Sequence, residues 1–447
     1  MAPYVTPGHR APRRCNWQLR IRAGSLYWAV ILQRQLAPFS SRNYRLFFSG
    51  QIVSLMGSWM TQTATVWLVY HITHSAFWLG VVACAGQLPG LLIGPAAGVW
   101  VDRLDRRLLL IATQVAAMLQ SLALAYFTLS GKITITQLTL LAMVQGVINA
   151  FDMPARQALP VLLVEKKEHL ANVIAMNVSM FHLARLVGPA VAGFVIAGFG
   201  AGFCYLFDSL SYLAVIAAFV AMRLRQVPVE KSGASIWDDF RSGLDYAFGF
   251  GPIRRLIFLI GSMALFGMSF AVLTPVYARD YFGGDARTLG LLMSSSATGS
   301  VIAAVYLSSR ESLRGLGRVI YAGAGLMGMA LIAFAFSRNL VLSIGCLVVA
   351  GCGTILVVAS SNTLLQNLVD EGKRGRVMSL YTMAFLGGMP IGSLLTGSLA
   401  QQFGTTAATC ANGVACLILG YLFFRQLPVF REQARPVLEA ARANIEH

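Results

Sequence analysis

Charged residues are scarce in this chain, and that scarcity defines its class. Only 12% of the 447 residues are Asp, Glu, Lys or Arg, whereas a soluble domain carries about 25%. None of these four residue types occurs between Leu46 and Val101. The apolar runs are long and do not alternate with a period of two, so they predict membrane-spanning helices rather than a β-barrel. The composition therefore predicts an all-α polytopic membrane protein.

Motifs for metal binding, disulfide frameworks and nucleotide hydrolysis are also missing. The seven cysteines are scattered, with five or more residues between even the closest pairs, and this spacing fits neither a disulfide framework nor a metal site. The six histidines are dispersed, so no catalytic cluster is expected at one membrane face. No Gly-x-x-x-x-Gly-Lys-Ser/Thr stretch occurs, which argues against an ATP-driven pump. We therefore predict no enzyme activity, no metal and no cofactor.

The net charge of +17 does not indicate nucleic-acid binding, because the basic residues follow a membrane topology. Thirty Lys and Arg residues fall in the two tails and in alternate loops on one side, and four fall on the other side. Basic residues mark the cytoplasmic side of a membrane protein. We therefore predict that both termini are cytoplasmic and that the number of spans is even. Arg185 belongs to neither side, because it lies within a predicted span.

Twelve apolar spans form two groups of six. The expected domains are a basic N-terminal tail (1–45), a first half (46–222), a cytoplasmic linker (223–254), a second half (255–424) and a C-terminal tail (425–447). The predicted spans are 46–70, 77–101, 108–129, 134–151, 173–197 and 203–222, then 255–278, 287–309, 316–336, 340–362, 377–400 and 405–424. In the linker, Ile236–Phe248 has apolar residues at helical spacing, which favours an amphipathic surface helix over a solvated one. Matching residues at offsets of 210 and 204 indicate a weak internal repeat.

The loop between the second and third spans has five charged residues in six positions. It reads Gly98-Val-Trp-Val-Asp102-Arg103-Leu-Asp105-Arg106-Arg107. The pattern Gly-x-x-x-Asp-Arg-x-x-Arg-Arg resembles the signature loop of the major facilitator superfamily, whereas an ordinary positive-inside loop would need only the arginines. The resemblance implies two six-helix halves with the substrate site between them at the bilayer midplane. It also implies a cytoplasmic gate made by Gly98, Asp102, Arg103, Arg106, Arg107 and Arg376.

Four further stretches resemble the exporter branch that includes the bacterial enterobactin exporter. They begin at Asn43, at Asn149 in the loop expected after span four, at Asn177 and at Arg374. The resemblance covers about residues 39–427. It implies a secondary exporter that works by alternating access.

Span five contains Gly188-Pro189-x-x-x-Gly193, which is similar to the antiporter motif of proton-driven exporters. A packing seam of small residues is the alternative interpretation. Ala142 stands where many proton-coupled relatives carry an arginine, so their coupling chemistry does not transfer directly.

Three ionisable residues within the spans are candidates for substrate binding or coupling. A charge within the membrane is costly and invites a functional explanation. Arg185 serves either transport or a structural hydrogen bond. His182, one turn earlier, is a packing residue or a titratable group in the cavity. Asp208 caps and pairs at the start of span six, or carries a proton.

Span one carries a polar stripe on an otherwise apolar helix. Its members follow helical spacing and are Gln51, Ser54, Ser58, Gln62 and Thr65. Because lipid contact would be unfavourable for them, we expect the stripe to face the central cavity.

These observations predict an exporter of a siderophore or similar amphipathic small molecule, exchanging protons across a bacterial cytoplasmic (inner) membrane. A multidrug or lysolipid transporter of the same fold is the first alternative, and a transport-inactive membrane scaffold is the second. The expected partners are the small-molecule substrate, protons and the lipid bilayer, with no nucleic acid. We expect a monomer.

Overall fold

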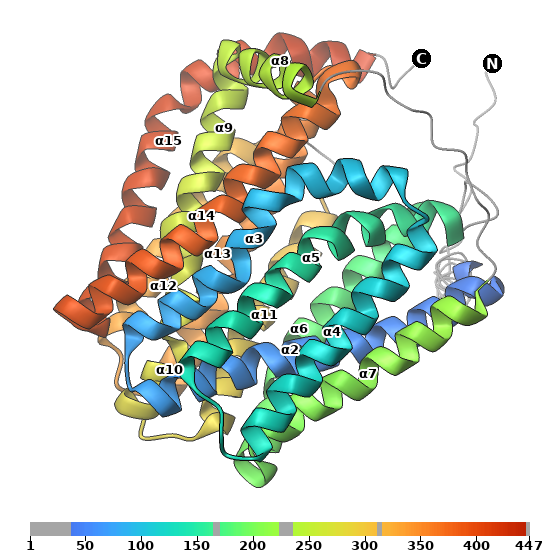
Figure 1. Ribbon diagram of the computed structural model, residues 1–447. Helices are drawn as coiled ribbons and strands as arrows, with labels where there is room; N and C mark the ends of the chain where they lie inside the picture. The colour runs from blue at the N-terminus through green and yellow to red at the C-terminus, as the bar shows by residue number, and fades with distance from the viewer. Residues whose placement is uncertain (1–36, 164–169, 223–235, 311–314, 444–447) are drawn as a thin grey trace, which may run out of the picture.

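The computed structural model describes residues 37–163, 170–222, 236–310 and 315–443 (Figure 1). The side chains of residues 37, 95, 96, 98, 99, 102, 103, 158, 160–162, 236–240 and 435–443 lie outside this description. The described residues form helices and turns and no strands, as the long apolar runs predicted.

The N-terminal half is a bundle of six helices that follow the short turn η1 (Ala37–Ser40). They are α2 (Arg42–Thr73), α3 (Ala76–Arg103), α4 (Arg106–Leu129), α5 (Ile135–Leu163), α6 (Leu170–Phe199) and α7 (Ala201–Ala221). Helix α2 packs against both α6 and α7, while α4 packs on α7 and α3 packs on α5. Helix α2 therefore lies between α6 and α7.

The C-terminal half contains another six spans, and its first span is irregular. That span joins α9 (Gly251–Ser262), the π-helical η3 (Met263–Met268), the 3₁₀ turn η4 (Ser269–Leu273), α10 (Thr274–Val276) and the π-helical η5 (Tyr277–Tyr281). The others are α11 (Ala286–Ser308), α12 (Leu316–Phe336), α13 (Leu340–Leu368), α14 (Arg374–Phe403, after turn η6, Glu371–Lys373) and α15 (Thr405–Ala443). The linker forms α8 (Ile236–Gly249), which packs on α9 and α14.

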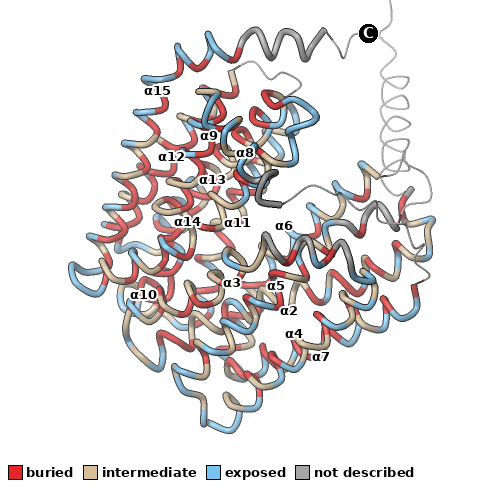
Figure 2. Tube along the Cα trace, turned by 45° about the horizontal axis from the view of Figure 1, so that its top comes forward, coloured by how far each residue is buried: buried red, intermediate tan, exposed pale blue. Residues whose placement is uncertain are grey.

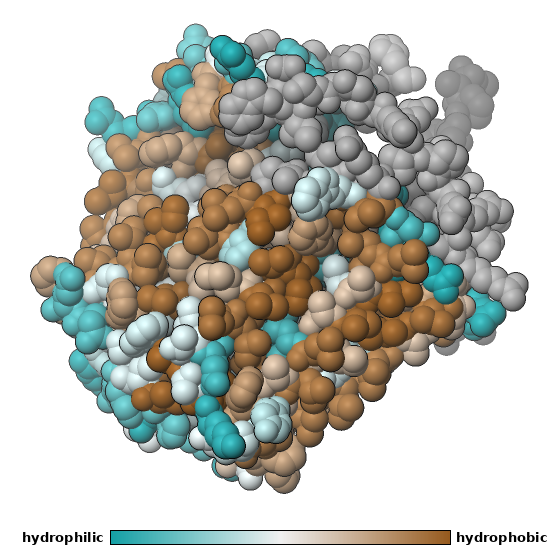
Figure 3. Space-filling model, in the orientation of Figure 1, coloured by the Kyte–Doolittle hydropathy of each residue, from teal (hydrophilic) through white to brown (hydrophobic). Residues whose placement is uncertain are grey.

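Eleven spans in the described chain are long and apolar enough to cross a membrane. Helix α2 is not among them because its polar stripe lowers its hydropathy, yet it is 32 residues long and lies within the bundle. With α2, the chain has the twelve spans of the predicted fold. In Figure 3 apolar side chains cover the middle of the visible face, and hydrophilic ones gather toward its edges.

Two predicted boundaries differ from the structure. The stretch from Asn149 to Pro160, expected as a loop, is helical because α5 continues to Leu163. Helix α15 likewise continues past Arg425 to Ala443. Its apolar residues keep helical spacing beyond the membrane span, and Leu427, Phe430 and Ala434 are all buried.

The internal repeat is visible in the turns before the last helix of each half. Gly200, between α6 and α7, has a backbone φ of 94°, and Gly404, between α14 and α15, has 88°. Glycine adopts this left-handed region without the steric penalty of a Cβ atom. The two turns are separated by the offset of 204 residues seen in the sequence.

The two halves meet through α3 with α14 and through α6 with α11. Figure 1 shows the bundles meeting toward the bottom of the view, near α10, and diverging toward α8. In the rotated view of Figure 2, buried residues line the interior of each bundle. The described backbones of the two bundles are thus close together at one end, which we call the closed end, and further apart at the other, which we call the divided end.

Candidate functional site

The closed end is held by side chains from both halves. The Tyr70 hydroxyl at the end of α2 donates a hydrogen bond to the Asp280 carboxylate of η5. The Ser75 hydroxyl donates to Gln401 Oε1 over 2.8 Å. The start of α3 and the last turns of α14 are also in close backbone contact. A Cβ atom at Gly397 would lie 2.6 Å from the carbonyl oxygen of Ala76, so these helices touch without an intervening side chain.

The antiporter-like motif lies where α6 contacts two other helices. A Cβ atom at Gly188 would come within 2.5 Å of Trp59 Cβ on α2. A Cβ at Gly193 would come within 2.6 Å of the Ala286 carbonyl oxygen on α11, and one at Gly290 would meet the carbonyl oxygen of Pro189 at 2.3 Å. All three motif residues are buried. The motif therefore forms the seam that joins α6 to both α2 and the opposite half.

Arg185 lies on the α6 face between these two seams. At 3.6 residues per turn, Arg185 lies about 60° around the helix axis from Gly188 in one direction and about 80° from Gly193 in the other. Its guanidinium carbon is 5.9 Å from the centroid of the Trp59 ring, a cation–π arrangement. The side chain is half-buried, and the described residues offer it no hydrogen-bond acceptor or carboxylate. The predicted structural hydrogen bond is therefore not found.

His182 lies beside Arg185 on the preceding turn and is half-buried. Its ring packs edge-on against Phe181, which in turn packs edge-on against Trp59. No described residue forms a hydrogen bond with the imidazole. The three rings and Arg185 make one continuous cluster between α2 and α6.

The polar stripe of α2 does not face one cavity as expected. Gln51 and Ser54 are buried, Ser58 Oγ donates to the Ser54 carbonyl, and Thr65 Oγ1 is 3.2 Å from the Tyr205 hydroxyl of α7. Only Gln62 of the stripe is exposed. The helical pattern identified a polar face, but α7 and α5 cover most of it.

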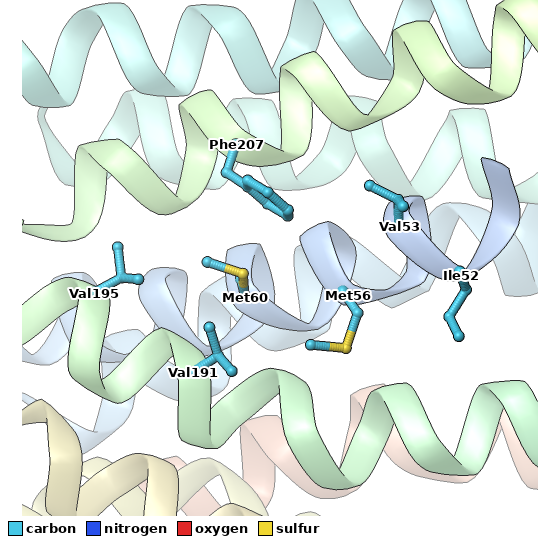
Figure 4. Close-up of a pocket in the computed structure, with 7 residues that line it drawn as sticks. All are labelled: Ile52, Val53, Met56, Met60, Val191, Val195 and Phe207. Carbon is cyan, nitrogen blue, oxygen red and sulfur yellow. The ribbon is translucent and has the colours of Figure 1, made fainter. Parts of the chain in front are cut away.

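The outer surface of α2 is apolar. A shallow groove of about 310 Å³ lies between α2, α6 and α7 (Figure 4), lined by Ile52, Val53, Met56, Met60, Val191, Val195 and Phe207. Nine residues, two and a half helical turns, separate exposed Val53 from exposed Gln62, so they lie on opposite faces. With no polar lining, the groove suits lipid contact, and Gln62 lies on the side toward the interior.

Asp208 is buried in the N-terminal half and does not cap a helix end. Gly200 precedes α7, so Asp208 lies in its second turn. Its Oδ2 atom accepts hydrogen bonds from Thr61 Oγ1 of α2 at 2.9 Å and from Ser121 Oγ of α4 at 3.1 Å. Its Oδ1 atom has no partner. The predicted capping role is wrong, because neutral hydroxyls from two neighbouring helices surround the carboxyl group.

A charged network near the divided end was not anticipated from the sequence. Asp152 and Arg156 on α5 form an ion pair of 2.7 Å, and Arg156 also donates to Gln51 of α2. Asp152 Oδ1 accepts from Thr113 and Gln114 of α4. The signal was an Asp and an Arg four residues apart, which pair on a helix. Because a loop is expected at this position from the sequence, the helical spacing of Asp152 and Arg156 was not used.

The predicted gate is described in part. The side chains of Gly98, Asp102 and Arg103 lie outside the described residues. Arg107 donates hydrogen bonds to the carbonyl oxygens of Phe219 and Val220 near the end of α7, and Arg106 beside it is half-buried. On the other half, Arg376 donates to Ser242 of α8. These contacts connect Arg107 to α7 and Arg376 to the linker helix α8.

No group of three or more His, Cys, Asp or Glu side chains that could hold a metal ion occurs in the part of the chain that the structure describes.

Comparison with known proteins identifies the sequence family. A family model described as "Transmembrane secretion effector", from the major facilitator superfamily, matches residues 33–444. The chain is 27% identical to the staphyloferrin A transporter of Staphylococcus aureus over 85% of this chain and 95% of that protein. It is 25% identical to the macrolide efflux protein A of Streptococcus pyogenes over 81% and 91%.

Solved structures show the same fold. A bacterial homologue of the human lysosomal transporter Spinster, in an inward-facing and occupied conformation, has a TM-score of 0.69. The match covers 88% of this chain and 98% of that one, at 14% identity.

Proposed function

The chain belongs to the transmembrane secretion effector family of the major facilitator superfamily, a family of transporters rather than enzymes, and from this we propose a secondary active exporter that works by alternating access. Its substrate is a siderophore or similar amphipathic small molecule, exchanged for protons. The relative named for staphyloferrin A supports the siderophore, and the macrolide efflux relative supports a drug exporter as the second candidate. The monomer lies in a bacterial cytoplasmic membrane with both termini inside.

The observation that carries this proposal is the difference between the two ends of the molecule. The described hydrogen bonds between the halves, such as Tyr70 to Asp280 and Ser75 to Gln401, lie at the closed end. The bundles diverge toward α8 (Figure 1). With basic residues marking the cytoplasmic side, the divided end opens inward. A carrier in this state accepts its substrate from the cytoplasm.

The reverse state requires the closed end to separate and the divided end to close. Closure would bring the loop that contains Asp102 and Arg107 toward the start of α14 at Arg376. The glycine seams at Gly188 and Gly397 let helices slide with little side-chain interlocking. Pro189 lacks a backbone donor and so provides a place for α6 to bend.

The experiment is transport in inside-out vesicles combined with a reversible lock. Ser75→Cys and Gln401→Cys, in a background with the native cysteines replaced, place two thiols at a described hydrogen bond of the closed end. We expect the unlocked variant to accumulate substrate. An uncoupler should abolish this accumulation, and a short thiol cross-linker should abolish it as well. A reductant that cleaves the linker should restore it.

Each single-cysteine variant treated with the same linker is the matched control and should keep transport. Accumulation that resists the uncoupler contradicts proton exchange. Full transport after cross-linking contradicts alternating access at this end. A complete absence of transport for siderophores and macrolides alike supports the scaffold.

A further inference from the structure

Arg185 is a cation within the spans for which the described residues supply no anion. Every acidic side chain described within the neighbouring spans is already engaged elsewhere. Asp152 binds Arg156, and Asp208 accepts hydroxyl hydrogen bonds within its own half. Asp280 accepts from Tyr70 at the closed end. The protein itself therefore offers no carboxylate to neutralise Arg185.

The position of Arg185 gives it access to the space between the halves. Exposed Leu183 and Phe194 lie on the opposite side of α6 from Arg185, about 160° and about 180° away around the helix. Arg185 lies on the α6 face between the seam with α2 at Gly188 and the seam with α11 at Gly193. Its charge thus faces the place where the two bundles come together.

The surroundings of Arg185 suit a bound anion with an apolar body. The Trp59 ring lies within cation–π range of the guanidinium, 5.9 Å from its carbon atom to the ring centroid. The planar guanidinium keeps its proton at any physiological pH and can donate two parallel hydrogen bonds to a carboxylate. The rings of Trp59, Phe181 and His182 provide a surface on which an aromatic or aliphatic portion can pack.

From this unpartnered cation and its aromatic surround we infer that Arg185 binds a carboxylate of the transported molecule. The inference rests on the proposed export function and narrows its substrate class to amphipathic organic anions that carry a carboxylate. A substrate anion supplies the neutralising charge that the protein lacks. A cationic drug, by contrast, would meet an uncompensated positive charge at this point.

The test measures binding and transport separately, with calcein as a fluorescent polycarboxylate, ethidium as a cation and erythromycin as a macrolide. Binding is followed by fluorescence anisotropy or, for erythromycin, by radiolabel, on purified protein in nanodiscs. We expect Arg185→Gln to weaken calcein binding at least tenfold, and Arg185→Lys to lose less because it keeps the charge. Wild-type protein should bind calcein more tightly than it binds either ethidium or the tetraester of calcein.

The matched control is Arg318→Gln, which removes the same charge from an exposed position at the start of α12. It should bind calcein as the wild type does. Thermal unfolding of each variant checks that the fold is retained, and Arg185→Lys remains informative if the Gln variant does not fold.

Unchanged calcein binding in Arg185→Gln overturns the anion site, as does wild-type protein that fails to bind calcein or prefers ethidium. If vesicles export erythromycin while calcein binding is absent, the site fails and the export function stands. If calcein binds through Arg185 but no vesicle accumulates any probe, the export function fails and the site stands. A phosphate monoester dye that binds more tightly than calcein points to a phosphate rather than a carboxylate ligand and also overturns the inference.

Discussion

The N-terminal half places charged side chains in the interior of its spans, whereas the described charged residues of the C-terminal half lie toward the ends of its spans, and hydroxyl groups and glycines occupy the interior. Asp152, Arg156, Arg185 and Asp208 all lie within α5, α6 and α7. In the other half, the comparable polar contact joins Ser269, Thr396 and Asn412, which are neutral and fully buried. Charges within a membrane protein are costly and usually functional. We therefore propose that ligand and coupling chemistry belong to the first half and that the second half is a closely packed counterpart.

The packing of the C-terminal half is dominated by close backbone contacts. A Cβ atom at Gly351 of α13 would lie 2.0 Å from the Ser296 carbonyl oxygen of α11, and one at Gly299 would lie 1.8 Å from the carbonyl oxygen of Val348. Membrane helices associate through such small residues because lipid offers no hydrophobic drive for association. Variants in this half should therefore change stability before they change substrate selection.

The largest loss of unfolding free energy should come from Asp152→Ala. Its removal leaves Arg156 without its ion-pair partner and leaves Gln114 Nε2 without the carboxylate that accepts its hydrogen bond, whereas Thr113 Oγ1 can still donate to the carbonyl oxygen of Leu110. Losing one partner of a largely buried pair costs about 3 kcal/mol of unfolding free energy. Thermal unfolding of the purified protein in detergent measures it. Glu371→Ala breaks the exposed pair with Arg374 at 4.0 Å and should change stability little. Equal losses in the two variants would contradict a special role for the network.

A smaller loss of unfolding free energy is expected for Gly351→Ala. The added methyl group must push α11 and α13 apart, and overpacking of this kind costs about 1–3 kcal/mol. Gly345→Ala in the same helix is the matched control, because a Cβ atom there meets nothing within 4 Å. It should be neutral or slightly stabilising, since alanine favours helices. If both variants melt at the wild-type temperature, the seam is looser than the structure shows.

The smallest change in stability, with the clearest change in transport, is expected for Asp208→Asn. The Asn carbonyl can still accept hydrogen bonds from Thr61 and Ser121, so the unfolding free energy should change by about 1 kcal/mol or less. Because an amide cannot exchange a proton as a carboxyl does, we expect uncoupler-sensitive accumulation to disappear while counterflow exchange of substrate continues. Parallel vesicle assays of accumulation and counterflow measure this.

Ser121→Ala is the control for Asp208, because it removes one hydrogen-bond donor and keeps the carboxyl group. It should retain uncoupler-sensitive accumulation. Normal proton-driven accumulation in Asp208→Asn would remove Asp208 from the coupling mechanism and leave it a structural residue.

Sequence reasoning succeeded where the relevant property is local. Hydropathy predicted the spans, and the five charged residues around Asp102 identified the loop that resembles the major facilitator family. It failed where a residue's role depends on a distant helix. For Asp208 the sequence predicts either a cap at the start of span six or a proton carrier, and it does not reveal the hydroxyl partners, which are 147 and 87 residues away in the chain.

The same limit applies to the polar stripe and to the Asp152 network. Helical spacing correctly grouped Gln51 with Ser54 on one face of α2, but it could not show that α5 and α7 cover that face. Asp152 and Arg156 have the spacing of an ion pair, yet only the continuation of α5 as a helix makes the pair possible.

The amino-acid sequence by itself determined the membrane class and the twelve spans, because a helix buried in lipid needs a long run of apolar residues. It also determined the family, because the charged loop around Asp102 is a local motif. The tertiary structure alone decided which end is closed and which carboxyl groups have hydrogen-bond or ion-pair partners. It also decided that Arg185 has no such partner among the described residues. Those outcomes depend on contacts between helices far apart in the chain. Arg185 shows the difference: its charge is evident in the sequence, but its lack of a partner is a property of the packed bundle.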